Sequence, residues 1–192
     1  KKNDLNIIMI FVSTSGFKNK KISEIIEILA VNKFKKIELS GGSTYYEGIE
    51  EDLIKLKVKY NLELQLHNYF PPPKDSFVLN LSSNNDVIFN RSVEHYKKSI
   101  EISKRLGANK FALHAGYLVD PDVSELGKKI NKKVFIQRSK GIEKFSLGYN
   151  ILKDFAGKEF NIYVENNVLS KNNYESFLFK NPLLFTDFNS YL

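Results

Sequence analysis

The sequence of 192 residues contains no cysteine, which excludes a disulfide scaffold, a thiolate metal site and a cysteine nucleophile. It also lacks a long apolar run. The longest, Ile7 to Val12, has six residues, far fewer than the roughly 20 that cross a bilayer. No signal-peptide pattern precedes this run. These absences favour a cytoplasmic protein that does not enter a membrane.

Arginine is scarce although the chain is basic. Lysine and arginine together number 29 against 22 acidic residues, a net charge of +7, but only Arg91, Arg105 and Arg138 are arginines. Arginine supplies the bidentate contacts that recognise bases and phosphates. The lysines are scattered and form no long block. We therefore interpret the charge as a solvated surface and do not expect a nucleic-acid partner.

Apolar residues make up 42 % of the chain, enough for the core of one domain over residues 1–192. Continuous or alternating apolar residues predict strands, and apolar residues at helical spacing predict helices between them. No glycine-rich nucleotide loop follows a strand. Strict alternation then predicts an α/β fold with a parallel sheet, doubly wound or closed into a barrel. Strands are predicted over 4–13, 36–40, 62–67, 110–114 and 161–165; helices over 22–29, 49–56, 93–106 (capped by Asn90 or Ser92) and 143–155.

Four predicted strands carry an ionisable residue at or near their C-terminal end: Glu38, His67, His114 and Glu165. Read with a period of two, each lies opposite the aliphatic or aromatic face of its strand. In a barrel that face is the interior, and barrel enzymes keep their chemistry at the C-terminal rim. We therefore expect these side chains to converge. Imidazole and carboxylate groups suit a divalent metal, although a histidine at a strand end can also be a hydrogen-bonded structural residue.

Three further features carry weaker expectations. His95 falls in the middle of a predicted helix and is interpreted as a surface residue. The pair Tyr45-Tyr46 and the run 71–73 of three prolines lie in loops on the rim side. We expect these loops to pack locally, with the alternative that they shape a pocket wall.

Five short motifs, in this order and spacing, resemble the xylose-isomerase-like TIM-barrel superfamily. That group contains sugar-phosphate isomerases and epimerases and the apurinic-site endonucleases, and the closest similarity is to its sugar phosphate isomerase/epimerase-like branch. The motifs are Ile-Glu-Leu at 37–39, His-Asn-Tyr-Phe-Pro-Pro-Pro at 67–73, Phe-Val-Leu-Asn-Leu-Ser-Ser at 77–83, His-Ala-Gly-Tyr at 114–117 and Tyr-Val-Glu-Asn-Asn at 163–167.

The resemblance implies a (β/α)8 barrel with metal at the C-terminal rim. Glu165 matches a glutamate that binds metal and acts as an acid or base, and His67 and His114 match metal-binding histidines. A divalent ion (zinc, manganese or magnesium) is the implied cofactor. Asn68 and Asn167 lie beside these positions, and with Glu38 they are candidate contacts to substrate.

The resemblance also predicts an incomplete TIM-type barrel of about five of the eight β/α units. A complete barrel needs about 250 residues, and the later strands of the family supply further metal ligands. We expect a fragment, or a protein completed by another chain. The open sheet edges predict pairing with another chain, such as a second copy in a homo-oligomer.

Three functions compete at this stage. The first is a metal-dependent isomerase or epimerase that moves a proton next to the carbonyl of a small-molecule sugar or sugar phosphate. The second is a phosphodiesterase acting on abasic DNA, favoured by the two histidines and disfavoured by the scarcity of arginine. The third is a non-catalytic truncated barrel.

Overall fold

The computed structural model describes residues 10–131 and 134–187. Strands and helices alternate along the chain, as predicted, and every strand pair within the two sheets is parallel. The strands are β1 (Val12–Ser13), β2 (Lys36–Leu39), β3 (Glu63–Leu66), β4 (Lys110–His114) and β5 (Asn161–Glu165). The helices are α1 (Ile22–Val31), α2 (Ile49–Tyr60), α3 (Asp86–Arg105), α4 (Arg138–Ala156) and α5 (Lys171–Ser176), with 3-10 turns at Thr14–Gly16 and Val123–Glu125.

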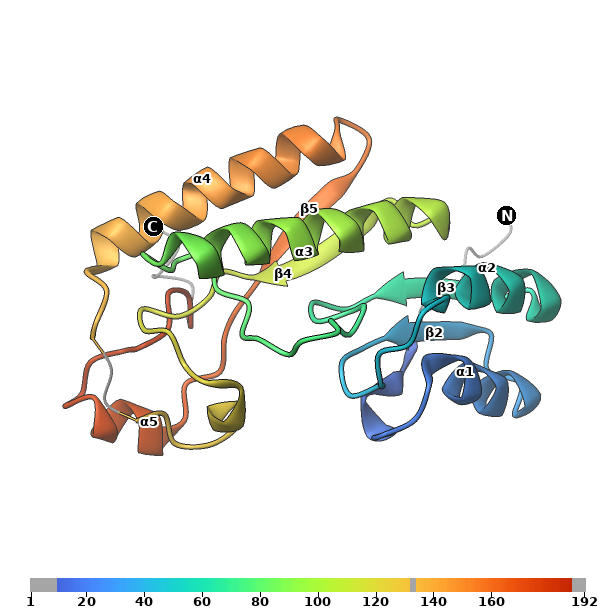
Figure 1. The fold of residues 1–192 in the computed structure, drawn as a ribbon, viewed down its shortest axis with the longest axis horizontal. Helices are drawn as coiled ribbons and strands as arrows, with labels where there is room; N and C mark the ends of the chain where they lie inside the picture. The colour runs from blue at the N-terminus through green and yellow to red at the C-terminus, as the bar shows by residue number, and fades with distance from the viewer. Residues whose placement is uncertain (1–9, 132–133, 188–192) are drawn as a thin grey trace, which may run out of the picture.

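The strands form two sheets, β1-β2-β3 and β4-β5. Strands follow chain order within each sheet, but no hydrogen-bonded ladder joins β3 to β4 among the described residues. We call this break the seam. Helix α3 packs against both β3 and β4 and so bridges the seam, and α4 lies beside α3 (Figure 1). The fold is therefore an incomplete barrel whose wall is in two parts.

The core lies where the apolar pattern predicts it. Ile22, Ile25 and Ile26 of α1 are fully buried. In α3, Tyr96 and Ile100 are at most 1 % exposed. The apolar faces of the three central strands are at most 2 % exposed: Ile37, Leu39, Leu64, Leu66, Phe111 and Leu113. Their burial leaves the opposite face, which carries the ionisable residues, for the barrel interior.

Some predicted boundaries are wrong. Of the first predicted strand, residues 4–9 lie outside the described residues, and only Val12 and Ser13 pair with β2. Helix α3 starts at Asp86 and not at Asn90 or Ser92, because the Asn85 side chain caps it by accepting a hydrogen bond from the Val87 amide at 3.0 Å. Helix α4 starts earlier than predicted, at Arg138. Helix ends depend on such caps more than on apolar spacing.

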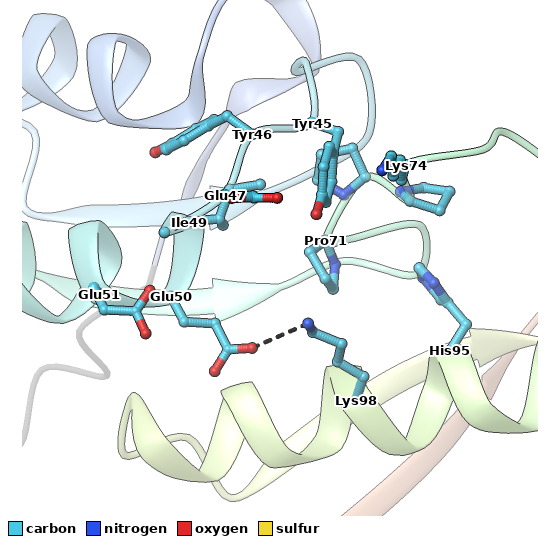
Figure 2. Close-up of a pocket in the computed structure, with 13 residues that line it drawn as sticks. Tyr45, Tyr46, Glu47, Ile49, Glu50, Glu51, Pro71, Lys74, His95 and Lys98 are labelled. Carbon is cyan, nitrogen blue, oxygen red and sulfur yellow. Dashed lines mark ion pairs between the residues drawn. The ribbon is translucent and has the colours of Figure 1, made fainter.

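The surface interpretation of His95 is also wrong. The residue is only 9 % exposed. Its ring stacks on Tyr69 with centroids 5.7 Å apart and meets the edge of Phe77 at 5.8 Å. Figure 2 shows His95 rising from α3 toward the proline run that follows β3. The loop after β3 covers this side of α3, and a helical period cannot reveal a second buried face.

No helix among the described residues is long and apolar enough to span a membrane.

Candidate functional site

His67, His114 and Glu165 lie together at the C-terminal ends of β3, β4 and β5; we call them the rim trio. The Glu165 Oε2 atom is 3.9 Å from His67 Nε2 and 3.7 Å from His114 Nε2. The imidazole rings are 6.5 Å apart and nearly perpendicular, at 77°. Each side chain is about one-third exposed, between 32 % and 36 %. The structure thus brings together three of the residues predicted from strand parity, with the carboxylate facing both imidazoles.

Backbone pairing explains how two of the three meet. His114 and Glu165 are register partners in the β4-β5 ladder, so their side chains share a face and a height. His67 follows β3, where its backbone amide donates to the Leu39 carbonyl at 2.8 Å. That bond continues the β2-β3 ladder by one residue and holds His67 at the rim.

Burial and charge act in opposite directions on His114. Burial lowers the pKa of His114 below its ordinary value, the Glu165 carboxylate raises it, and the lowering dominates. His114 is therefore mainly neutral at pH 7. Its Nδ1 atom lies 3.5 Å from the Glu165 backbone oxygen. A proton on Nδ1 would leave Nε2, which faces the Glu165 carboxylate oxygen, as an acceptor.

The rim trio has the donor chemistry of a divalent metal site, but the arrangement is not yet one. Neighbouring ligands of a tetrahedral zinc ion lie about 3.3 Å apart, given bonds of roughly 2.0–2.1 Å, whereas the distances here are 3.7 and 3.9 Å. Across residues 10–131 and 134–187, no group of three or more His, Asp or Glu side chains could hold a metal ion as placed. The described side chains thus do not fit a metal without moving.

The three candidate substrate contacts, Asn68, Asn167 and Glu38, differ in their position and in their hydrogen-bond partners. Asn68 is 8 % exposed, and its Oδ1 accepts a hydrogen bond from the buried Tyr96 hydroxyl at 2.8 Å. Asn167 lies beyond β5, where its side-chain amide nitrogen Nδ2 donates a hydrogen bond to the Gly116 backbone carbonyl at 3.4 Å. Glu38 lies in β2 opposite Gln65 of β3, and none of the described polar contacts joins it to the rim trio.

A cavity of about 440 Å³ opens beside His114, which lines it together with Asn167, Tyr117 and the loop that contains Lys128 and Lys129. Burial raises the pKa of the Tyr117 hydroxyl, so the hydroxyl stays protonated and can donate a hydrogen bond. Tyr117 appears in the His-Ala-Gly-Tyr motif but was not among the predicted site residues. A cavity of this size suits a small molecule.

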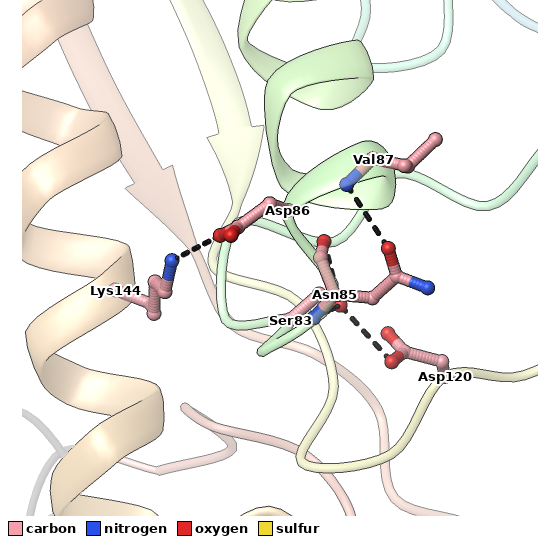
Figure 3. Close-up of polar contacts among 6 residues, drawn as sticks. All are labelled: Ser83, Asn85, Asp86, Val87, Asp120 and Lys144. Atoms are coloured by element: carbon pink, nitrogen blue, oxygen red, sulfur yellow. Dashed lines mark hydrogen bonds and ion pairs between the residues drawn. The ribbon is translucent and has the colours of Figure 1, made fainter.

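A buried polar network holds the loops that follow β3 and β4. Asn80, 1 % exposed, donates to Asp120 at 2.8 Å, and its Oδ1 accepts from the Tyr117 amide at 2.9 Å. Ser83 donates to the same Asp120 carboxylate at 3.0 Å (Figure 3). A Cβ on Gly116 would lie 2.2 Å from Asn80 Oδ1, so only glycine fits there. Asn80 was quoted only as part of a motif, and no local pattern shows its partners.

The segment 182–185 adds a wall that the sequence did not predict. Leu183, Leu184 and Phe185 are at most 7 % exposed. The Phe185 backbone carbonyl accepts a hydrogen bond from the Asn167 backbone amide at 2.9 Å. Leu183 forms an antiparallel β-bridge with Tyr117. Because Leu183 also lines the cavity, this segment helps to close the pocket beyond β5.

Solved structures with similar folds include two sugar epimerases and an epimerase-like protein. A D-tagatose 3-epimerase-like protein superposes with a TM-score of 0.58 at 22 % identity over 85 % of this chain and 55 % of its own. The E. coli 3-keto-D-glucoside 4-epimerase YcjR gives 0.57 at 10 % identity over 81 % and 55 %. A D-psicose 3-epimerase crystallised in the presence of D-fructose gives 0.57 at 16 % identity over 84 % and 53 %.

This chain spans about half the length of each of these structures. No protein-family model matches the sequence, and neither does any curated protein. At these identities the similarity concerns the fold alone. The described chain therefore has the fold of an incomplete TIM barrel, as the alternation of strands and helices and the motifs predict.

Proposed function

We propose that the rim trio belongs to the active site of a sugar or sugar-phosphate isomerase or epimerase. The observation that carries the proposal is the position of the Glu165 carboxylate, 3.7 and 3.9 Å from two imidazole nitrogens. One of these imidazoles, His114, lines a cavity of about 440 Å³. The similarity to two sugar epimerases and an epimerase-like protein supports this reaction class, and the D-fructose present with one of them supports a ketose substrate.

Glu165 is the proposed acid–base group. Its carboxylate takes a proton from the carbon next to the substrate carbonyl, and the C–H electron pair moves toward the carbonyl oxygen to form an enediolate. Glu165 can return the proton on the same face to the neighbouring carbon, which moves the carbonyl. Inversion of configuration needs a second acid on the opposite face, which the trio does not supply. Proton transfer by a positioned side chain contributes about 10²–10⁴-fold to a rate.

The same three side chains are the proposed ligands of a divalent cation: His67 and His114 through nitrogen, and Glu165 through oxygen. Zinc, manganese or magnesium would polarise the substrate carbonyl when bound. Because no group of three described side chains is placed to hold a metal ion, this part of the proposal requires the two imidazoles to close on the carboxylate. Further ligands would come from outside the trio.

Asn68, Asn167 and Glu38 are proposed to contact substrate hydroxyls, with unequal support. Asn167 lines the cavity, so its amide can reach a ligand there. The Tyr96 hydroxyl donates to Asn68 Oδ1, which orients that amide and leaves its nitrogen as the free donor. Glu38 lies in β2, on the side of β3 away from β4 and β5. It would therefore contact only a substrate that extends past His67.

Hydrogen exchange at carbon tests the reaction directly. The 192-residue chain is incubated in D₂O with D-fructose, with and without Mn²⁺, and NMR follows deuterium entering the carbon next to the carbonyl. We expect exchange that falls about 10²–10⁴-fold in Glu165→Gln and persists in Glu159→Gln, an exposed glutamate before β5. Equal exchange in both variants would contradict the role of Glu165. Cleavage of abasic DNA without exchange would favour the phosphodiesterase alternative.

The ends of the described sheets suggest how copies associate. Strands β1 and β5 are each paired on one side only among the described residues, and an unpaired strand edge can pair with another chain. We propose a homo-oligomer formed through such an edge. Sedimentation analysis measures it, and a monomer at all concentrations would contradict it.

A further inference from the structure

Tyr117 is held firmly by its backbone and its ring, yet its hydroxyl has no described partner. The backbone amide donates to Asn80 Oδ1 at 2.9 Å, and an antiparallel bridge joins the residue to Leu183. The ring packs against a small buried cluster: Val119, Ile130 and Phe177. The hydroxyl forms no hydrogen bond with the described residues and is not shielded from solvent. A partly buried tyrosine hydroxyl ordinarily has a partner, so this one is available to a ligand.

Tyr117 and Asn167 lie together in the wall of the cavity of about 440 Å³. The Asn167 side-chain nitrogen donates to the Gly116 carbonyl at 3.4 Å, and Tyr117 is the next residue along the chain. Two polar side chains from different strand ends therefore meet at one part of the wall. A phenol hydroxyl and a carboxamide together offer donors and acceptors, which are the groups that bind the hydroxyls of a sugar.

This pair lies to one side of the groups proposed to react. Of the rim trio, His114 lines the cavity, whereas His67 and Glu165 do not. Burial, followed by Tyr117 and Glu165, raises the pKa of the buried Tyr96 hydroxyl, so Tyr117 and Glu165 both lie within electrostatic range of that hydroxyl. A ligand whose reacting carbon lies at Glu165 would extend past His114 toward Tyr117. The pair would then contact the end of the substrate away from the reacting carbon.

We propose that Tyr117 is a specificity-determining residue that donates a hydrogen bond to the terminal hydroxyl of a ketose, while Asn167 binds the neighbouring hydroxyl. The ligand class rests on the proposed function. Tyr117 takes no part in the proton transfer. A contact remote from the reacting carbon holds substrate and transition state equally, so it changes KM and leaves kcat unchanged.

Sugars that lack one hydroxyl test the contact. D-fructose, 6-deoxy-D-fructose and 1-deoxy-D-fructose are each titrated into the 192-residue chain and into Tyr117→Phe, with Kd measured by NMR. Each sugar is compared between two proteins, so its own equilibrium between ring forms cancels. We expect Tyr117→Phe to weaken binding of D-fructose and 1-deoxy-D-fructose about 3–10-fold and to leave the Kd of 6-deoxy-D-fructose unchanged, because that sugar lacks the hydroxyl that Tyr117 contacts.

A structural role of Tyr117 would give a different pattern. Equal weakening for all three sugars, or an effect lost only with 1-deoxy-D-fructose, would overturn the contact. Binding of none of the three sugars would overturn it too. In the unaltered chain the ring signals of Tyr117 should shift with D-fructose, and signals that stay in place would contradict the proposal even if Tyr117→Phe failed to fold.

Tyr45→Phe is the matched control. Tyr45 is 44 % exposed and lines a separate cavity of about 450 Å³ together with the proline run 71–73 (Figure 2). Loss of its hydroxyl should leave the Kd of every sugar unchanged. Weakening as large as that of Tyr117→Phe would show that the effect is not local to the cavity beside His114.

Deuterium exchange separates this contact from the proposed function. Tyr117→Phe should raise the KM for exchange about 3–10-fold at unchanged kcat, whereas Glu165→Gln should lose exchange. Binding that depends on Tyr117 in a chain without exchange would contradict the proposed function and support the contact. Exchange that depends on Glu165, with the same KM and Kd in Tyr117→Phe as in the unaltered chain, would overturn the contact alone.

Discussion

The two halves of the barrel wall contribute to the rim trio in different ways. The β4-β5 half supplies His114 and Glu165 as partners in one ladder, so backbone hydrogen bonds set their relative position. The β1-β2-β3 half supplies His67, which faces them across the seam, where no described ladder exists. The geometry of the trio therefore depends on the contacts that hold the two halves together.

Buried side chains take the place of the missing ladder. Tyr96 of α3 packs edge-on against Phe111 of β4, with centroids 5.9 Å apart, and its hydroxyl donates to Asn68 beyond β3. Asn80 joins the loop after β3 to the loop after β4. Backbone hydrogen bonds thus set the relative position of trio residues within one half. A few side-chain contacts set the position of His67 relative to His114 and Glu165 across the seam. The predictions below test whether the halves behave as one unit.

The largest effect is expected from removing core volume in either half. Ile25 of α1 and Leu152 of α4 are both fully buried, and each substitution by alanine should cost about 2–5 kcal/mol. If the halves unfold together, each variant shifts one transition in a denaturant titration followed by circular dichroism. A second transition in either variant would show that the halves unfold separately.

The next effect concerns His95 of α3, which lies beneath the loop that follows β3. Its pKa is about 4 in the folded chain against about 6.5 when unfolded. Between these values the unfolded state binds more protons, so the free energy of unfolding should fall as the pH drops from 6.5 to 4. The loss should reach up to about 3 kcal/mol.

Comparison with His95→Phe isolates this contribution, because carboxylates also titrate near pH 4. The variant should show a flatter dependence of stability on pH between 6.5 and 4, measured by urea unfolding at each pH. Parallel curves for the two proteins would mean that His95 is not held neutral by burial.

Gly116→Ala tests the polar network at the seam. A Cβ there would lie 2.2 Å from Asn80 Oδ1, at a φ of +109°, and the strain should cost about 1–3 kcal/mol. Gly107→Ala is the matched control, because its φ is also positive, at +75°, but the added Cβ would meet open space. Urea unfolding should rank Gly116→Ala as the more destabilised variant. The reverse order would remove the network from the account.

The smallest effect is expected at the surface. Lys144 of α4 lies 2.7 Å from Asp86 at the start of α3 (Figure 3), but Asp86 is 77 % exposed. Exposed pairs contribute little. Lys144→Met should therefore lower the free energy of unfolding by about 0.5 kcal/mol or less in thermal unfolding. A loss as large as that of Gly116→Ala would show that surface charge, and not the buried network, joins the halves.

The spacing of residues along the sequence predicted which face of a strand or helix each side chain lies on, because the backbone period sets that face. The strand-end residues His67, His114 and Glu165 followed from a period of two and a common strand end, and the Ile22/Ile25/Leu29 stripe followed from helical spacing. The seam, the partners of Asn80 and the buried environment of His95 were not predictable. They depend on residues far apart in the chain that meet only after the helices pack.

The most direct test of the central claim is the titration of His114 in Glu165→Gln, followed by NMR of the imidazole protons. The claim is that the Glu165 carboxylate faces both histidines across the rim. Removing its charge should lower the pKa of His114 further, because that carboxylate opposes the effect of burial. The control Glu159→Gln should leave the titration unchanged. An unchanged or raised pKa of His114 in Glu165→Gln would contradict the shared site.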